Sequence, residues 1–315
     1  MMSVLVHDVP IIVLNWNGWD DSIICIESIY RAEKDAKVWL VDNNSDINRS
    51  DELIALFPML RVIELAENFG WAVGNNKAIE IAITEKFQFV FLLNNDCSVD
   101  FNFLKSSLIL MDDETAAIGS RIVTFDNQYV IFDGEYSGKS KKVVTSSNEL
   151  INSKLVNGAG MLVNLSAFMS IGEFDKRYFC YDEESEWCER ATQLANFEIK
   201  TNLASTIKHK REGSDIGENA LYYRTRNKFI ETSVRTPYIP YLIDTFLTKI
   251  NEERKQGKEK KVKSLLCGLQ DGLNKKFCYR TTLIPNYIVR SYAFLYRASL
   301  TRVILKIYFK LISKF

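Results

Sequence analysis

The stretch VFLLNNDCSV, residues 90–99, passes directly from an apolar run into two amides and an acid, and it decides the fold prediction. Residues 89–93 are all apolar, which is typical of a strand covered on both faces. Asn94, Asn95 and Asp96 follow at the carboxyl end of that strand. Because ligands bind at this edge in open α/β sheets, the stretch predicts a buried strand with a polar site at its end.

Strand and helix patterns alternate through the first hundred residues, up to and including this stretch. This alternation predicts βαβ units with right-handed crossovers, and therefore an α/β fold with a mostly parallel central sheet flanked by helices. The expected strands are VPIIVL, KVWLV, RVIEL and FVFLL, and the expected helices are residues 20–31, DELIALF and residues 72–86.

Polar or small residues follow each of these strands, and a parallel sheet places such strand ends side by side. Any one of these loops is explained by turns and helix caps, which use Asn, Asp and Gly. Together, the loops suit a polar ligand in one crevice. The residues are Asn15, Asn17, Asp42, Asn43, Asn44, Asn68, Gly70, Asn94, Asn95 and Asp96.

The remaining sequence predicts a second half of this domain and an appendage. We expect a domain at residues 1–234, with halves at 1–100 and 101–234, and a basic helical extension at residues 235–315. The expected elements are a helix at 101–111, a strand at AAIGSRIV, hairpins and loops at 133–153, a short helix at SAFMSIGEFD, an acidic helix at YDEESEWCERATQLA, one or two strands at IKTNLASTIKHK, a helix at 219–234 and a solvated helix or linker at 249–263.

Composition excludes several classes of protein. The 315 residues carry a formal net charge of zero, which predicts no nucleic-acid partner. The six cysteines include no CxxC pair, so neither a zinc site nor a disulfide framework is expected, and reduced thiols in the cytoplasm are the simplest interpretation. No Lys or Arg precedes the apolar residues 9–14, and no run of 18 apolar residues exists, so the sequence predicts neither a signal peptide nor a transmembrane helix.

The last part of the chain is basic, because no acidic residue follows Asp271. Its final segment is NYIVRSYAFLYRASLTRVILKIYFKLISKF, in which Arg302, Lys306, Lys310 and Lys314 recur at every fourth position. On a helix they form one basic stripe opposite an apolar side, which suits an anionic membrane surface. The alternative is that the apolar side packs on its own domain or on a second subunit, which leaves a homo-oligomer open.

Three further features could carry chemistry. Asp96 could hold Mg²⁺ or Mn²⁺, since hard cations prefer carboxylate oxygens. His209, one of two histidines, precedes cations and a glycine that could cradle a phosphate, although a lone histidine is more often a packed or surface residue. The acidic helix could supply a general base, although acids in a first turn also serve the helix dipole. Its acids are Asp182, Glu183, Glu184 and Glu186.

An ordered set of motifs across residues 9–230 resembles the bacterial family-2 glycosyltransferases of the GT-A fold, and most of all the rhamnosyltransferase-like enzymes of O-antigen and capsule assembly. The ordered set is more specific than any single motif. The motifs are VLNWN, VDNNS, ENFGWAVGNNKAI, FLLNNDCSV, VNGAGMLVNLSAFMSIGEFDKRYFCYDEESEWCERA, KHKREGS and YYRTRN.

The resemblance implies a nucleotide site at the carboxyl edge of the sheet. The Asp42 carboxylate would accept from N3–H of a uracil or thymine, and the small residues near Gly70 would let backbone approach the nucleoside. The residues that it assigns to nucleotide binding are Asn15, Asn17, Asp42, Asn68, Gly70, Gly74, Asn75, Asn94 and Asn95.

The resemblance also implies a metal site and a catalytic base. Asp96 stands at the final acidic position of the family's DxD motif, although Asn94 replaces the first acid, and His209 matches the family histidine beside the metal and diphosphate. Glu184 matches the base, with Glu183 and Asp182 as further candidates, and the metal would be Mg²⁺ or Mn²⁺. Residues 226–227 match a downstream RN element.

The implied activity is inverting transfer of a sugar from a dTDP- or UDP-sugar to a hydroxyl of a saccharide or a polyprenyl-diphosphate-linked acceptor, in cell-surface polysaccharide biosynthesis. The enzyme would be cytoplasmic and peripheral on the inner face of the cell membrane. Two alternatives stay open. One is a catalytically silent nucleotide-sugar-binding or assembly subunit, and the other is a sugar nucleotidyltransferase, although NWNGWDDS is not the Gly- and Arg-rich loop that the latter needs.

Overall fold

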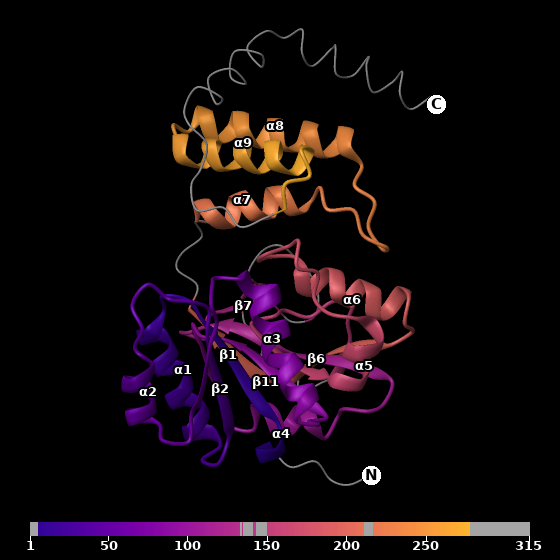
Figure 1. Ribbon diagram of the computed structural model, residues 1–315. Coiled ribbons are helices and arrows are strands. Elements are labelled where there is room, and N and C mark those ends of the chain that lie inside the picture. Colours follow the sequence, from indigo (N-terminus) through magenta and orange to yellow (C-terminus); the bar gives the residue numbers. More distant parts are fainter. Residues whose placement is uncertain (1–5, 133, 135–140, 143–149, 211–216, 278–315) are drawn as a thin grey trace, which may run out of the picture. The chain divides into compact units, whose positions relative to one another are not determined.

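A computed structural model describes residues 6–132, 134, 141–142, 150–210 and 217–277 of the chain (Figure 1). The chain divides into two compact units. The first comprises Met1–Lys176 and Asp182–Glu212, and the second comprises Arg177–Tyr181 and Gly213–Phe315. The predicted boundary after residue 234 stays a prediction, and this division groups the helix before it with the helices that follow.

The described strands form one mixed sheet of eleven strands, in the order β3-β2-β1-β4-β10-β6-β11-β5, with β7 and β9 joined to β6 and β11 and with β8 joined to β7. They are β1 (Pro10–Asn15), β2 (Lys37–Asp42), β3 (Arg61–Glu64), β4 (Phe89–Asn94), β5 (Cys97–Val99), β6 (Thr115–Thr124), β7 (Tyr129–Phe132), β8 (Lys141–Lys142), β9 (Leu150–Asn152), β10 (Gly160–Asn164) and β11 (Glu198–His209).

The α/β fold class that the sequence predicts is confirmed, and the predicted parallel order holds from β3 to β4. Beyond β4, β10 runs antiparallel to both β4 and β6. The sequence does not reveal this reversal, because all residues of β10 are buried and a buried strand carries no sign of its direction.

Helices flank the sheet of the first unit. They are α1 (Trp19–Ala32), α2 (Ser50–Leu56), α3 (Gly70–Thr84), α4 (Phe103–Leu108), α5 (Leu165–Ile171) and α6 (Glu183–Gln193), with a short 3-10 helix η1 (Val6–Asp8) before β1. The predicted helices at 20–31 and 72–86 agree with α1 and α3 to within two residues. The helix predicted at 101–111 is shorter, because it begins after Asn102, which adopts a left-handed conformation with φ of 63°.

Alternate residues of the central strands pack against helices on opposite faces. Ile11 and Val13 of β1 join the cluster that holds apolar residues of α1, α2 and α4. Ile12, between them, joins a second cluster with residues of α3, α5 and α6. Because side chains alternate along a strand, two separate cores cover the two faces and leave the strand ends open for a site.

The second unit contains three described helices, α7 (Glu218–Asn227), α8 (Ile239–Lys255) and α9 (Glu259–Leu273), which pack around a core that includes Leu221, Ile250 and Leu265. The helix predicted at 219–234 is α7, and it ends seven residues earlier, before a stretch of poor helix formers, TSVRTP. The predicted solvated helix or linker at 249–263 covers the end of α8, a turn with Gly257 at φ of 69°, and the start of α9.

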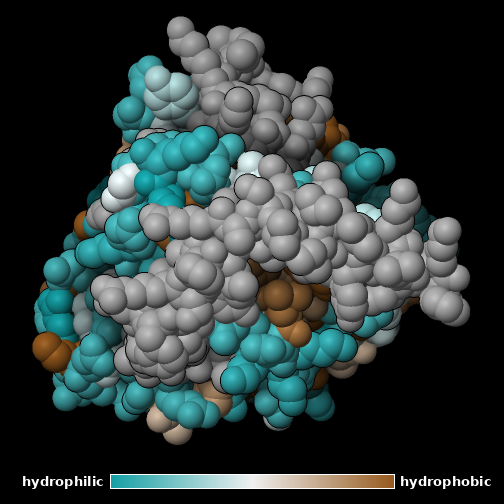
Figure 2. Space-filling model, turned by 90° about the horizontal axis from the view of Figure 1, so that it is seen from above, coloured by the Kyte–Doolittle hydropathy of each residue, from teal (hydrophilic) through white to brown (hydrophobic). Residues whose placement is uncertain are grey.

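The described surface visible in Figure 2 is mostly hydrophilic, with hydrophobic residues in small groups. Among the described helices, we find none that has both the length and the apolar character needed to cross a membrane. The described cysteines, which include Cys25 and Cys97, are free thiols. The basic tail and most of the segment at 133–153 lie outside the described residues.

Candidate functional site

The carboxyl ends of β1, β2 and β4 meet at one edge of the sheet, as the sequence predicts. The strand registers pair Asn15 with Asp42 and Leu14 with Asn94. Asn15 is fully buried, and its Nδ2 donates to Asp42 Oδ1 at 3.0 Å. The backbone N–H and hydroxyl of Ser45 donate to Asp42 at 3.1 and 2.5 Å. The Asp42 carboxylate is therefore fixed in place at this edge by neutral donors.

Asn95 fastens the end of β4 to the loop between β1 and α1. Its Nδ2 donates to Asn15 Oδ1 at 3.2 Å, to the Gly18 carbonyl at 3.0 Å and to Ser22 Oγ at 3.1 Å. A Cβ at Gly18 would lie 2.4 Å from this amide nitrogen, so a larger residue there would displace the Asn95 side chain. Asn95 is thus a structural member of the edge, whatever it contributes to a ligand.

The turn before α3 is held by two amides. Asn43 Nδ2 donates to Asn68 Oδ1 at 3.0 Å and to the Gly70 carbonyl at 3.1 Å, and Asn43 Oδ1 accepts from the Phe69 N–H. Gly70 has φ of 76°, a backbone conformation that favours glycine. The sequence prediction placed Asn43 after the second strand but gave it no role, since an amide that binds a neighbouring loop looks the same in sequence as one that binds a ligand.

Gly74, Asn75 and Asn94 each have a local contact. A Cβ at Gly74 would come within 2.8 Å of Leu14 Cδ1, so this glycine allows α3 to pack closely on β1. Asn75 donates to the Trp71 carbonyl at 2.9 Å within α3. The Trp71 indole N–H donates to Asn94 Oδ1 at 3.0 Å, which gives the amide at the first position of the motif a partner that the sequence did not predict. Asn17, in the loop between β1 and α1, adopts a left-handed backbone conformation with φ of 57°.

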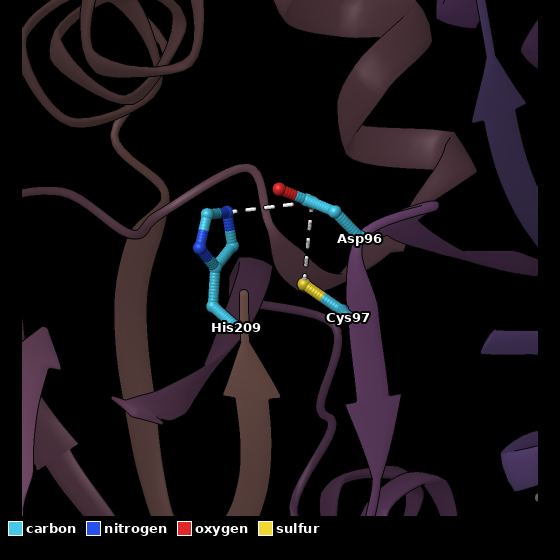
Figure 3. A group of neighbouring side chains, drawn as sticks. All are labelled: Asp96, Cys97 and His209. Atoms are coloured by element: carbon cyan, nitrogen blue, oxygen red, sulfur yellow. Dashed lines mark hydrogen bonds and ion pairs between the residues drawn. The ribbon is translucent and has the colours of Figure 1, made fainter. Parts of the chain in front are cut away.

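Asp96 and His209 lie together with Cys97 (Figure 3). The cause is the antiparallel pairing of β5 with β11, which places His209 opposite Cys97. His209 Nε2 lies 3.5 Å from Asp96 Oδ1, and Cys97 Sγ lies 4.0 Å from the same oxygen. The ligand atoms of the three residues are all within 4.8 Å of one another. The predicted Asp96 and His209 thus form a compact group, to which the structure adds Cys97.

The electrostatics of this group favour a cation. Burial raises the pKa of Asp96 above its ordinary value, with Asp21 adding to the rise, while His209 and Lys210 oppose it. Burial, together with Asp96, also raises the pKa of the Cys97 thiol. A raised carboxyl pKa means that the local positive charge does not fully offset desolvation, so a bound divalent ion would stabilise the ionised form.

The donor set fits a divalent cation. The Asp96 side chain is 32% exposed and that of His209 is 23% exposed, so a ligand can reach both. Carboxylate oxygen and imidazole nitrogen suit Mn²⁺ and, less well, Mg²⁺, which prefers oxygen alone. In the described part of the chain, His209 Nδ1 is buried without a hydrogen-bond partner.

The acidic helix α6 begins directly after Asp182, which has φ of 72°. Glu183 is 3% exposed, whereas Glu184 and Asp182 are half-buried, so Glu183 is the least accessible of the three predicted bases. Glu186 is only 1% exposed and accepts two hydrogen bonds from Arg190 Nε, at 2.9 and 3.0 Å, which gives it a structural role. The convergence of Glu184 with Asp96 on one cavity stays a prediction.

The family comparison matches this half of the chain. The sequence model described as "Glycosyl transferase family 2" matches residues 11–171, which is more than half of the 315 residues. The chain belongs to glycosyl transferase family 2. The matched range includes the carboxyl edge from Asn15 to Asp96, whereas Glu184 and His209 lie beyond it. No protein with a curated description matches the sequence significantly.

Similar solved structures confirm the GT-A fold of this chain. A structure of GalNAc-T7 with UDP, GalNAc and Mn²⁺ is similar with a TM-score of 0.54 and 15% identity, over 85% of this chain and 56% of that chain. TarS from S. aureus is similar with a TM-score of 0.50 and 14% identity, over 76% of this chain and 43% of that one. A structure of residues 1–349 of TarS is similar with a TM-score of 0.51 and 12% identity, over 88% of this chain and 94% of that chain. This chain thus spans just over half the length of the GalNAc-T7 structure. At identities of 12–15%, these similarities establish the fold alone.

Proposed function

We propose that the protein is an inverting, metal-dependent glycosyltransferase that moves a sugar from a dTDP- or UDP-sugar to an acceptor hydroxyl. The observation that carries this proposal is the pair Asp96 and His209, 3.5 Å apart, in which Asp96 belongs to the range that matches family 2. A metal held there would neutralise the diphosphate as charge builds on it during departure. The GalNAc-T7 structure, which contains UDP and Mn²⁺, supports this choice of ligands.

The nucleotide base lies beside Asp42 in this proposal. Asp42 Oδ2 accepts one hydrogen bond, from the Ser45 N–H, and a carboxylate oxygen can accept a second. A uracil or thymine N3–H could supply it, whereas a cytosine lacks that donor. The rest of the proposed nucleotide surface comprises Asn15, Asn17, Asn68, Gly70, Gly74, Asn75, Asn94 and Asn95.

Glu184 is the proposed general base, with Asp182 and Glu183 as alternatives. A general base removes the proton of the acceptor hydroxyl as the new bond forms, and a well-placed one contributes about 10²- to 10⁴-fold to the rate. Glu184 is half-buried on α6, whereas Glu183 is buried and Glu186 pairs with Arg190.

The acceptor in this proposal is a saccharide or a polyprenyl-diphosphate-linked sugar, and the product belongs to a cell-surface polysaccharide such as an O-antigen, with rhamnose as a candidate sugar. The support is the sequence resemblance together with the basic, apolar tail, which suits the inner face of the cell membrane.

Donor turnover tests the proposal. The full chain is incubated with a panel of dTDP- and UDP-sugars, and release of the nucleoside diphosphate is measured with EDTA, Mg²⁺ or Mn²⁺. We expect turnover with at least one donor, its loss in EDTA, and a decrease of about 10²-fold or more in Glu184→Gln and in Asp96→Ala.

Glu189→Gln, on the same helix, is the matched control and should retain activity. Full turnover in Glu184→Gln and Asp96→Ala would refute the site assignment. Binding of a nucleotide sugar without any turnover would instead indicate a catalytically silent binding subunit.

A further inference from the structure

Arg226 and Asn227, at the end of α7, hold one short segment of backbone. Arg226 Nη2 donates to the carbonyls of Arg177 and Tyr178 at 2.9 and 2.6 Å. Asn227 Nδ2 donates to the carbonyls of Tyr178, Cys180 and Tyr181 at 3.3, 2.9 and 2.7 Å. The two side chains therefore bind four carbonyls of Arg177–Tyr181, a segment that belongs to the second unit with α7.

The two side chains also bind each other. Arg226 Nε and Nη2 donate to Asn227 Oδ1 at 3.0 and 2.7 Å, which directs the amide nitrogen of Asn227 toward the carbonyls. The guanidinium lies 4.8 Å from the ring centre of Tyr223, and Arg226 and Asn227 are 0% and 2% exposed. Burying a guanidinium is unfavourable unless its donors are satisfied, and here both Nε and Nη2 of Arg226 have acceptors.

The segment that they hold has an unusual backbone. Phe179, Tyr181 and Asp182 have φ values of 61°, 70° and 72°. Such left-handed conformations are uncommon in residues with a side chain and persist only where the surroundings impose them. Directly after Tyr181 the chain re-enters the first unit at Asp182 and begins α6.

We propose that Arg226 and Asn227 are positioning residues that fix the start of α6, and thereby the direction of the proposed base Glu184. This inference rests on the proposed function. The last carbonyl that they bind belongs to Tyr181, three residues before Glu184. Since a shift of about 1 Å at a reacting group can lower a rate on the order of 10²-fold, backbone held this close to the base affects catalysis without touching substrate.

Asn227→Asp separates positioning from general stability. The carboxylate keeps its attraction to Arg226, but it cannot donate and it repels the three carbonyl oxygens that Asn227 binds. We expect kcat for the donor to fall about 10-fold or more, while the Kd for UDP with Mn²⁺, measured by calorimetry, changes less than about twofold. Asn227→Gln, which keeps the donor group, should recover part of kcat.

Leu221→Ala is the matched control, because it removes a buried contact of α7 without touching a carbonyl. It should lower the melting temperature and leave kcat per folded molecule unchanged. Equal kcat losses in Asn227→Asp and Leu221→Ala would overturn the proposal. Hydrogen exchange supplies a readout that needs no activity: Asn227→Asp should speed exchange in the first turn of α6, and Leu221→Ala should not. If the wild type turned over no donor, the exchange result would still decide the positioning role.

Discussion

At the scale of single residues, the amides at the carboxyl edge are used first to build the edge itself. Asn15, Asn43 and Asn95 each donate through their side-chain nitrogen to other loops of the first unit. An amide both donates and accepts, whereas an ionised carboxylate only accepts. This difference explains why the edge contains so many asparagines where a purely anionic site would have aspartates.

Asn95→Asp tests that explanation. The new carboxylate would face the oxygens of Asn15, Gly18 and Ser22 in place of donating to them. Leaving buried acceptors without a donor costs about 1–3 kcal/mol, and for a domain of this size about 1 kcal/mol shifts the melting temperature by roughly 2–4 °C. We therefore expect a loss of several degrees, measured by circular dichroism at pH 7.

Asn44→Asp is the control for the added charge, because Asn44 is exposed, has φ of 60° and lies in the neighbouring loop. It should unfold close to the wild-type temperature. An Asn95→Asp variant as stable as Asn44→Asp would show that Asn95 does not hold the loop.

How far the site could be predicted depends on which contacts are local. Asp96 follows a strand end directly, so its place at the edge could be predicted. Its neighbour His209 arrives through the pairing of β5 with β11, and β5 has only three residues, too few to show a strand pattern. In the sequence, only the resemblance to family-2 glycosyltransferases placed His209 beside Asp96. Trp71 and Cys97 were missed because aromatic and small buried residues look like ordinary core.

At the scale of elements, two glycines of α9, spaced about one turn apart, let it pack closely on α7 and on Phe229 just after α7. A Cβ at Gly268 would lie 2.6 Å from the Tyr222 carbonyl oxygen and 2.8 Å from Thr225 Cβ. A Cβ at Gly272 would lie 2.4 Å from the ring of Phe229. A Cβ at Gly268 would meet backbone, which cannot move aside as the end of a flexible side chain can. Position 268 therefore tolerates a larger residue less well than position 272.

Gly268→Ala should therefore destabilise the second unit. In an exposed helix, this change stabilises by about 0.5–1 kcal/mol, because alanine has the higher helix propensity. Here the methyl group must push α7 and α9 apart, and overpacking typically costs about 1–3 kcal/mol. The expected result is faster hydrogen exchange in α7 and earlier thermal unfolding of the full chain.

Lys260→Ala, at an exposed position of the same helix, serves as the comparison and should change little. Stabilisation by Gly268→Ala would contradict the close packing of α7 and α9.

The elements themselves were predicted unevenly. The parallel half from β1 to β4 follows from the alternation of strand and helix patterns, because each crossover has a recognisable length and period. The strands β5 and β9 have three residues each, which is too short for such a pattern. Strand β10 is buried along its whole length, so its sequence does not show its direction. α8 and α9 share one mixed-charge run, in which the turn at Gly257 separates two helices that the composition does not distinguish.

At the scale of the whole molecule, the chain passes between its two units more than once. It leaves the first unit after Lys176, returns at Asp182 and leaves again after Glu212. The family match ends at residue 171, before the first of these crossings. The range that matches the family model is therefore contiguous and precedes both crossings.

The basic tail of this second part gives a prediction for the full-length protein. Arg302, Lys306, Lys310 and Lys314 carry four positive charges at every fourth position of an apolar segment. At about 1 kcal/mol per cation near an anionic surface, four charges amount to about 4 kcal/mol, or on the order of 10³-fold in partition. Replacing all four by Gln should release the protein from vesicles that contain phosphatidylglycerol, measured by co-sedimentation in 0.1 M salt.

The control replaces four other cations by Gln, which lowers the net charge by the same amount. These cations lie in α8, α9 and the turn between them, and they are Lys255, Lys258, Lys260 and Lys261. This variant should still sediment with the vesicles, and both variants should keep donor turnover in the absence of lipid. Raising the salt should weaken binding of the wild type, since charges at a surface are screened within about 10 Å at 0.1 M. Equal binding by the two variants would count against a membrane role, and concentration-dependent dimers lost only in the tail variant would assign the apolar side to a second copy of the chain.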